Sequence, residues 1–148
     1  MASQDQRLLK ESLDLVAPVA DQLIAAFYHR LFTEHPELRP MFPAAMDPQR
    51  ERLLLGAVIA LVTHFDHPEN LLPALTAMGR RHETYGVSLG HYAAVGSALL
   101  ATLRDFAGAA WSPAYEGAWA RAYTFAAGTM MQAGALSAVE QEEEPLAA

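Results

Sequence analysis

Apolar residues recur at intervals of three and four along most of the chain, which is the spacing of a helix with one buried face. Strand-like alternation of useful length is missing from the sequence. Ser3 and Gln6 have the spacing of a capping box, which favours a helix start at that point. The apolar stripe that follows consists of Leu8, Leu9, Leu13 and Val16. The pattern therefore predicts an all-α fold.

Prolines, glycines and capping residues divide this pattern into six main helices and one short turn. Pro18 is expected to open the second helix, which runs towards His35. Pro36 and Pro40 then restrict the chain to a short turn, and Gly86 is expected to end the fourth helix. The remaining helix starts are predicted at Asp47-Pro48, Asn70, Ser88 and Ser112-Pro113.

The length of 148 residues fits one domain with a hydrophobic core of its own. We expect residues 1–138 to form that domain and residues 139–148, which are rich in glutamate, to form a disordered acidic tail. The start of the chain is polar and lacks a signal-peptide pattern, and the longest apolar run, residues 53–62, is too short to cross a bilayer. A cytoplasmic protein without a membrane partner is therefore expected.

The composition limits the chemistry that the chain can perform. Hydrophobic residues make up 52% and charged residues only 18%, so packing, a partner or an apolar ligand must cover much apolar surface. The net charge of −7 argues against a nucleic acid or an anionic membrane as partner. Because the chain has no cysteine, disulfides, thiolate ligands, iron–sulfur clusters and cysteine catalysis are excluded.

His82 is the strongest candidate for a functional residue. It follows Leu75 and Met78 at spacings of three and four, so the three side chains share one face near the end of a helix. An imidazole on an apolar helix, with Tyr28 and Phe42 on earlier segments, is an arrangement with which helical proteins hold a haem iron. On spacing alone, the alternative is a core or capping histidine that bonds to a backbone carbonyl.

The other histidines favour ordinary structural roles. His64 and His67 have metal-like spacing, but they precede Pro68 at a helix end, where solvent and the helix dipole favour histidine. His82-Glu83 matches the first half of a zinc-protease motif, but Gly86 stands where its second histidine belongs. The histidines expected to be exposed on polar faces or near a helix start are His29, His35 and His91.

Tyr28, Phe42, Gln49 and Leu53 are further candidates, each with an ordinary alternative. Tyr28 lies on an apolar helix face, so its hydroxyl needs a partner, which a backbone carbonyl would also provide. Phe42 lies between two prolines, where either a ligand edge or core packing would account for it. Gln49 and Leu53 share a helix face that suits a pocket wall, although glutamine in a first helical turn is often solvated.

Taken together and in this order, these residues resemble the globin domain of bacterial flavohaemoglobins and single-domain bacterial haemoglobins. The resemblance covers roughly residues 5 to 135. It implies the globin fold, with helices packed around a haem pocket. The matching stretches are 27–32 (FYHRLF), 35–42 (HPELRPMF), 49–51 (QRE), 70–75 (NLLPAL), His82, 92–96 (YAAVG), 99–103 (LLATL) and 118–123 (AWARAY).

The resemblance assigns a role to each candidate. His82 corresponds to the proximal iron ligand, and Tyr28 to the distal tyrosine that donates a hydrogen bond to the bound gas. Phe42 corresponds to the phenylalanine packed against the porphyrin, and Gln49 and Leu53 to the distal wall. Arg81 is expected to pair with a haem propionate. The other residues expected to bind the cofactor are Val87, Tyr92 and Val95.

The implied function is a haem b globin that binds O₂, NO and CO reversibly at a pentacoordinate iron. Nitric oxide dioxygenation would need an external reductase, since the chain ends where the flavin and nicotinamide domains of flavohaemoglobins begin. A gas sensor, a haem-free interaction module and the globin part of a longer flavohaemoglobin are the alternatives. We expect a monomer or a homodimer.

Two features depart from the family pattern. Flavohaemoglobins pair the tyrosine matched by Tyr92 with a glutamate on the last helix, and Leu136, with Gly134 nearby, stands at that place here. The iron–histidine bond is therefore expected to be weaker than in flavohaemoglobins. The loop between Phe42 and Gln49 is also short for the family, so Arg50 or Arg52 is an alternative to Gln49 at the pocket mouth.

Overall fold

The computed structural model describes residues 2–43 and 47–147, with side chains as far as residue 135. These residues form helices and no strands, which confirms the all-α prediction. The six main helices are α1 (Gln4–Val16), α2 (Ala20–Glu34), α3 (Pro48–Thr63), α4 (Leu72–Thr84), α5 (Leu89–Ala107) and α6 (Pro113–Ala147). The four short 3₁₀ helices are η1 (Ala17–Val19), η2 (Pro36–Met41), η3 (Pro68–Asn70) and η4 (Gly108–Ala110).

Most helix starts lie where the capping residues predict them. The Ser3 hydroxyl accepts a hydrogen bond from the Gln6 amide at 3.1 Å, and the Asp47 carboxylate accepts one from the Arg50 amide at 2.8 Å. Gly86 ends the turn that follows α4. Its φ of 77° is a backbone conformation that residues other than glycine rarely adopt. These starts and this stop follow from local chemistry alone.

Two predicted starts are wrong by one or two residues. Pro18 lies in η1, so α2 begins at Ala20, because the chain passes from α1 to α2 through one 3₁₀ turn without a break. Asn70 lies in η3, and Leu71 precedes α4 without a side-chain cap. Pro73 stands in the first turn of α4, where its missing amide costs no hydrogen bond.

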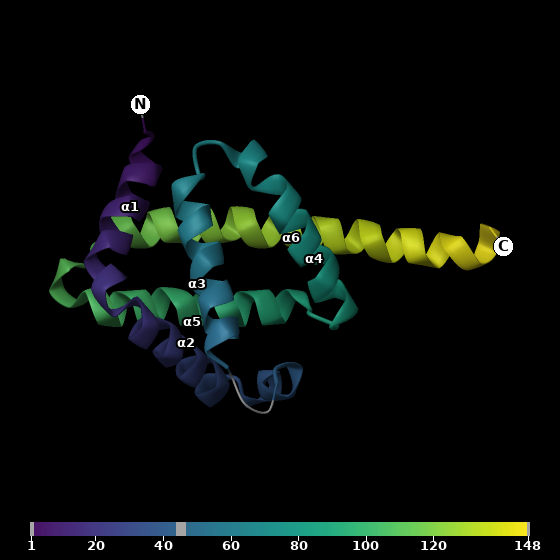
Figure 1. Cartoon of the computed structure of the whole chain (residues 1–148), viewed down its shortest axis with the longest axis horizontal. Helices are drawn as coiled ribbons and strands as arrows, with labels where there is room; N and C mark the ends of the chain where they lie inside the picture. The colour runs from purple at the N-terminus through teal and green to yellow at the C-terminus, as the bar shows by residue number, and fades with distance from the viewer. Residues whose placement is uncertain (1, 44–46, 148) are drawn as a thin grey trace.

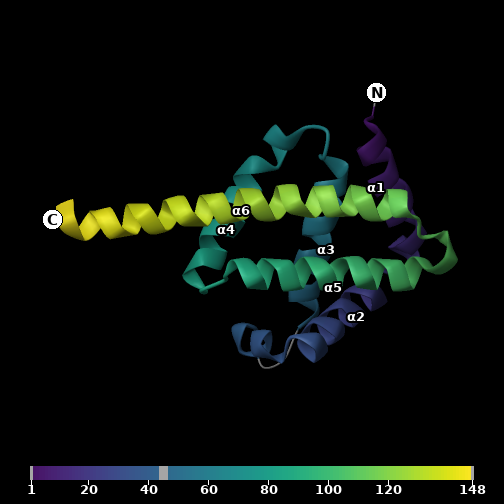
Figure 2. The same ribbon diagram turned by 180° about the vertical axis from the view of Figure 1, so that it is seen from behind.

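The helices cross rather than forming a parallel bundle (Figure 1). The long helices α5 and α6 run beside each other, and α3 crosses both of them, as Figure 2 shows from behind. Helix α4 packs on α6, and α2 packs on α5. The C-terminal part of α6 extends past the other helices (Figure 1). The expectation of a disordered acidic tail after residue 138 stays a prediction.

The main core joins the first and last helices. The side chains of Leu9, Phe27 and Trp119 are among the most completely buried of those described. The Trp119 indole donates a hydrogen bond at 2.8 Å to the Ser12 hydroxyl, which donates in turn to the Leu8 carbonyl at 2.7 Å. Both polar groups are thus satisfied inside the core, and the pair fixes α1 against α6.

Helix α4 approaches α6 more closely than ordinary side chains allow. A Cβ atom added to Gly79 would lie 2.2 Å from the carbonyl oxygen of Met130 and 2.7 Å from its Cα. The two backbones are therefore in direct contact at this point. Because His82 lies one turn further along α4, this contact sets its position.

Among the residues that the structure describes, no helix is long and apolar enough to span a membrane.

Replacing Gly79 by alanine is expected to destabilise the fold by about 1–3 kcal/mol, because α4 must move away from the Met130 backbone. Gly56→Ala is the matched control, since nothing lies near that position and the better helix propensity of alanine should add up to about 1 kcal/mol. Urea denaturation of both variants measures the difference. Equal stability of the two variants would contradict the close contact.

Candidate functional site

Two adjoining cavities lie between the helices, next to His82. The inner one, of about 160 Å³, is bounded by residues from α2 to α6, and the outer one, of about 180 Å³, opens between η2, α3, α4 and α5. Four residues line both cavities: His82, Val87, His91 and Val95. The inner cavity is almost wholly apolar, with Leu54, Val58, Leu75, Met78, Leu99 and Met130 among its lining residues.

The His82 imidazole is anchored by a backbone carbonyl. Its Nδ1 lies 2.6 Å from the carbonyl oxygen of Met78, one turn earlier in α4. A carbonyl oxygen can only accept, so Nδ1 carries the proton and donates it. In the neutral ring this tautomer has its lone pair on Nε2, which is the form of histidine that binds a metal. The ring also stacks against Tyr92, with centroids 6.0 Å apart and planes 24° apart.

Tyr28 is buried among aromatic rings and is only 9% exposed. Its ring centroid lies 5.0 Å from that of Phe27 and 5.8 Å from that of Phe42, and these two rings line the inner and the outer cavity respectively. Burial raises the pKa of the Tyr28 phenol to about 12, although the nearby Arg50 charge opposes this. The hydroxyl therefore keeps its proton at neutral pH. None of the described residues forms a hydrogen bond with it.

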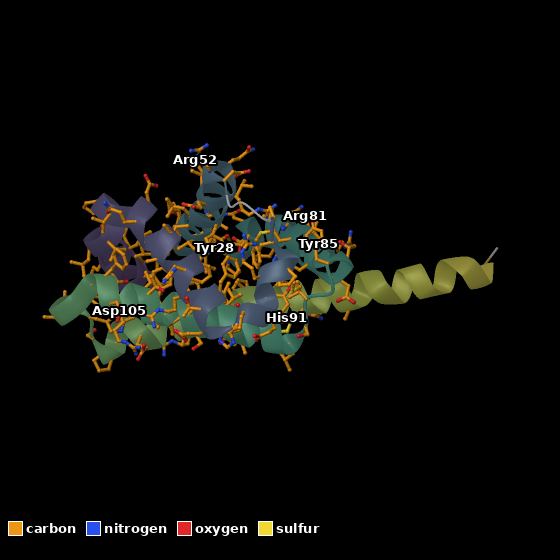
Figure 3. All side chains as sticks on the ribbon, turned by 90° about the horizontal axis from the view of Figure 1, so that it is seen from below. Tyr28, Arg52, Arg81, Tyr85, His91 and Asp105 are labelled. Carbon is orange, nitrogen blue, oxygen red and sulfur yellow. The ribbon has the colours of Figure 1, made fainter. Side chains whose placement is uncertain are left out.

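The structure brings most of the predicted cofactor residues together. Phe42 lines the outer cavity, Tyr92 lines the inner one, and Val87 and Val95 line both. Arg81 is exposed and lies one turn before Tyr85, which lines the outer cavity, and Figure 3 labels the two residues at the C-terminal end of α4. Their roles in binding a cofactor stay predictions.

Gln49 and Leu53 lie outside both cavities. Leu53 is 67% exposed and Gln49 is also exposed, whereas Leu54 lines the inner cavity. Consecutive residues of a helix point about 100° apart, so the rotation of α3 that brings Leu54 inward turns Leu53 out. The distal-wall role of Leu53 is therefore corrected in favour of Leu54. Arg50, the short-loop alternative, lines the outer cavity four residues before Leu54, and its role at the pocket mouth stays a prediction.

His91 has two structural roles that the sequence did not predict: it caps the start of α5 and it lines both cavities. Its Nδ1 accepts a hydrogen bond from the Ser88 amide at 2.9 Å, and the Ser88 hydroxyl accepts one from the His91 amide at 3.3 Å. This is a capping box in which histidine takes the place of the usual glutamate or glutamine. The cap brings His91 to both cavities instead of leaving it exposed. The spacing of three from Ser88 was the available signal.

A carboxylate of α4 approaches α6 at Gly134. A Cβ atom added to Gly134 would lie 3.1 Å from Cβ and 3.3 Å from Oε2 of Glu83. Burial and the Glu83 charge both raise the pKa of Tyr92. Because Gly134 has no side chain, α6 leaves room for the Glu83 side chain of α4. Leu136, the other candidate for this place, lies outside the residues whose side chains are described.

The alternative metal sites gain no support. Among the side chains that the structure describes, three or more histidine and acidic residues do not gather around a common point. His67 lies 3.4 Å from Glu69 and is mostly exposed, and His64 caps the end of α3. His64 and His67 therefore have the solvated, helix-end character that the sequence indicates.

Comparisons with known proteins identify relatives along most of the chain. A flavohemoprotein of Rhodopirellula baltica is 37% identical over 123 residues, which are 82% of this chain and 30% of the relative. A flavohemoprotein of Chromobacterium violaceum is 33% identical over 88% of this chain and 33% of its own length. The chain thus spans about a third of the length of these curated relatives.

Solved structures share the fold. An engineered carbene transferase from Rhodothermus marinus superposes with a TM-score of 0.83 at 24% identity, covering 96% of this chain and 99% of the other. A bacterial globin from Campylobacter jejuni has a TM-score of 0.76 at 23% identity, covering 90% and 96%. The sequence profile of the globin family matches residues 25–130, well over half of the chain. This protein therefore belongs to the globin family.

Proposed function

We propose that this globin holds a haem through His82 and binds diatomic gases, O₂ and NO, reversibly. The observation that carries the proposal is the His82 imidazole, which has its proton committed to the Met78 carbonyl at 2.6 Å and borders two cavities. The remaining nitrogen is free to bind iron. The names of the relatives, flavohemoproteins of two bacteria, support the same cofactor.

The residues present fit a haem. The porphyrin is a flat apolar ring with two carboxylates at one edge, and the inner cavity is apolar while arginine lies at the outer one. Arg50 and Arg81 would hold the propionates as charge-assisted pairs. The chain has no cysteine to attach a haem covalently, which favours haem b. Bound there, the cofactor would supply an iron with one position open to a gas.

Tyr28 would hold a polar gas ligand. Its phenol keeps the proton at neutral pH, lies among apolar rings and has no hydrogen-bond partner among the described residues. A donor in a site of low dielectric interacts more strongly with a partly charged ligand than it would in water. Tyr28 would therefore slow the release of O₂ and affect CO much less.

As an enzyme, the protein would convert NO and O₂ to nitrate with one electron from a flavin reductase. The net reaction balances, because nitrate contains the nitrogen and all three oxygen atoms, and the added electron supplies its charge. The flavohemoprotein relatives are about three times as long as this chain, which supports a reductase on another domain or another protein. The proposals of a cytoplasmic location and of a monomer or homodimer rest on the sequence.

Removing the imidazole should remove the iron ligand. The absorption spectrum of the ferrous, gas-free wild type is expected to show a five-coordinate haem that becomes six-coordinate with CO, and His82→Gly should lose both spectra. Free imidazole should restore them in His82→Gly, which separates ligand loss from misfolding. His67→Ala, on the surface, is the control and should match the wild type. A wild type that takes up no supplied hemin would leave a helical interaction module.

Removing the Tyr28 hydroxyl should speed O₂ release. Loss of one neutral hydrogen bond corresponds to a rise of roughly 2- to 13-fold in the dissociation rate of Tyr28→Phe. Stopped-flow displacement of O₂ by CO measures this rate, and the CO dissociation rate is an internal control that should change little. With a phenol pKa of about 12, the wild-type rate should not change through neutral pH. An unchanged O₂ rate would mean that another residue holds the ligand.

The iron–histidine bond is expected to be weaker than in flavohaemoglobins. The Nδ1 proton of His82 is donated to the neutral Met78 carbonyl, and Gly134 offers no carboxylate from α6. The imidazole therefore gains less negative charge and donates less electron density. The iron–histidine stretching frequency in the resonance Raman spectrum should accordingly be lower. A frequency as high as that of a flavohaemoglobin recorded alongside would contradict this.

A further inference from the structure

The His91 side chain lines both cavities while the start of its own helix holds its ring. The Ser88 amide donates a hydrogen bond at 2.9 Å to Nδ1 of His91. An amide N–H can only donate, so Nδ1 presents its lone pair and the ring proton lies on Nε2. This Nε2–H group has no hydrogen-bond partner among the residues that the structure describes. His91 therefore offers a donor that the protein itself does not use.

The two histidines beside the cavities have opposite tautomers. Nδ1 of His82 lies 2.6 Å from an acceptor, the Met78 carbonyl, whereas Nδ1 of His91 lies 2.9 Å from a donor. A neutral His82 therefore has a lone pair at Nε2, which suits a metal, and His91 has a proton at the same atom. Their backbone partners thus suit His82 to a metal ion and His91 to a hydrogen-bond acceptor.

The outer cavity gathers hydrogen-bond donors without a carboxylate of the protein to receive them. Arg50 from α3, Tyr85 at the end of α4 and His91 from α5 all line it. Among the described residues, no aspartate or glutamate lines either cavity. Donors at the edge of an apolar space fit a ligand that has an apolar body and an anionic edge.

We propose that His91 is a second anchor of the cofactor, and that its Nε2–H donates a hydrogen bond to a carboxylate at the edge of the haem. The inference rests on the proposed function and adds a binding residue to it. Arg50 and Arg81 would attract that edge by their charge. His91 would instead fix one oxygen by direction, because Ser88 already holds its ring. The same imidazole would link the start of α5 to the cofactor.

Two substitutions separate this binding role from the capping role. Glutamate and glutamine are the usual partners of serine in a capping box, so His91→Glu and His91→Gln should both keep the start of α5. His91→Gln also keeps an N–H donor, whereas His91→Glu replaces it with a negative charge. His29→Glu is the matched control, because His29 is exposed on α2 and lines neither cavity.

The measurement is the rate at which the loaded protein releases hemin to an excess of apomyoglobin, followed by absorption. His91→Glu should release hemin roughly tenfold faster than the wild type, which is the scale of a hydrogen bond to a charged group. His91→Gln and His29→Glu should stay near the wild-type rate. Hemin dimethyl ester, which has no charged carboxylate, is the second probe. With this probe His91→Glu should match the wild type, because the anion that His91 binds is gone.

Three results would overturn the inference and leave the proposed function intact. The first is release of hemin from His91→Glu at the wild-type rate. The second is faster release by the same factor for hemin and its dimethyl ester, which would restrict His91 to a structural role. The third is release from His91→Gln as fast as from His91→Glu. A wild type that takes up no hemin would instead reject the proposed function.

Discussion

The backbone contact between α4 and α6 at Gly79 is the constraint on which the site depends. A Cβ atom at that position would lie 2.2 Å from the Met130 carbonyl oxygen. The helices can therefore be this close only because Gly79 has no side chain. One turn later, Gly134 gives the same freedom to Glu83. These two contacts fix the rotation of α4, and this rotation brings Met78 and His82 to the cavities.

The site separates neutral groups from charged ones. Inside, the phenols of Tyr28 and Tyr123 have raised pKa values and keep their protons, and the His82 Nδ1 donates to a backbone carbonyl. Charge lies at the outer cavity, on Arg50, and Arg81 is exposed one turn before Tyr85, which lines the same cavity. A ligand with an apolar body and an anionic edge matches this division. A small neutral gas is the other kind of molecule that such an interior admits at little cost.

Local chemistry made much of the fold predictable from the sequence. Ser3, Asp47 and Ser88 cap the helices that they were expected to cap, because the hydrogen bonds they form lie within three residues. His82 could be singled out because its apolar stripe is also local. The burial of Tyr28 followed in the same way from the pattern of its helix.

Tertiary contacts determine the parts that could not be predicted. The choice between Leu53 and Leu54 depends on the rotation of α3, which packing against the neighbouring helices sets and which no local signal reports. The approach of Glu83 to Gly134 joins residues on two helices that are far apart in sequence. His91 was missed for a different reason, because histidine is an unusual member of a capping box.

The central claim is that a neutral His82 imidazole, whose Nδ1–H donates a hydrogen bond to the Met78 carbonyl, is the ligand of a haem iron. Proton NMR of the ferrous, gas-free protein tests it most directly, because a paramagnetic iron shifts the Nδ1 proton of its histidine ligand far downfield. The account predicts one such exchangeable signal, which disappears in deuterated water and is missing from His82→Gly supplied with N-methylimidazole. A haem-loaded protein without that signal, or one whose signal survives replacement of His82, would contradict it.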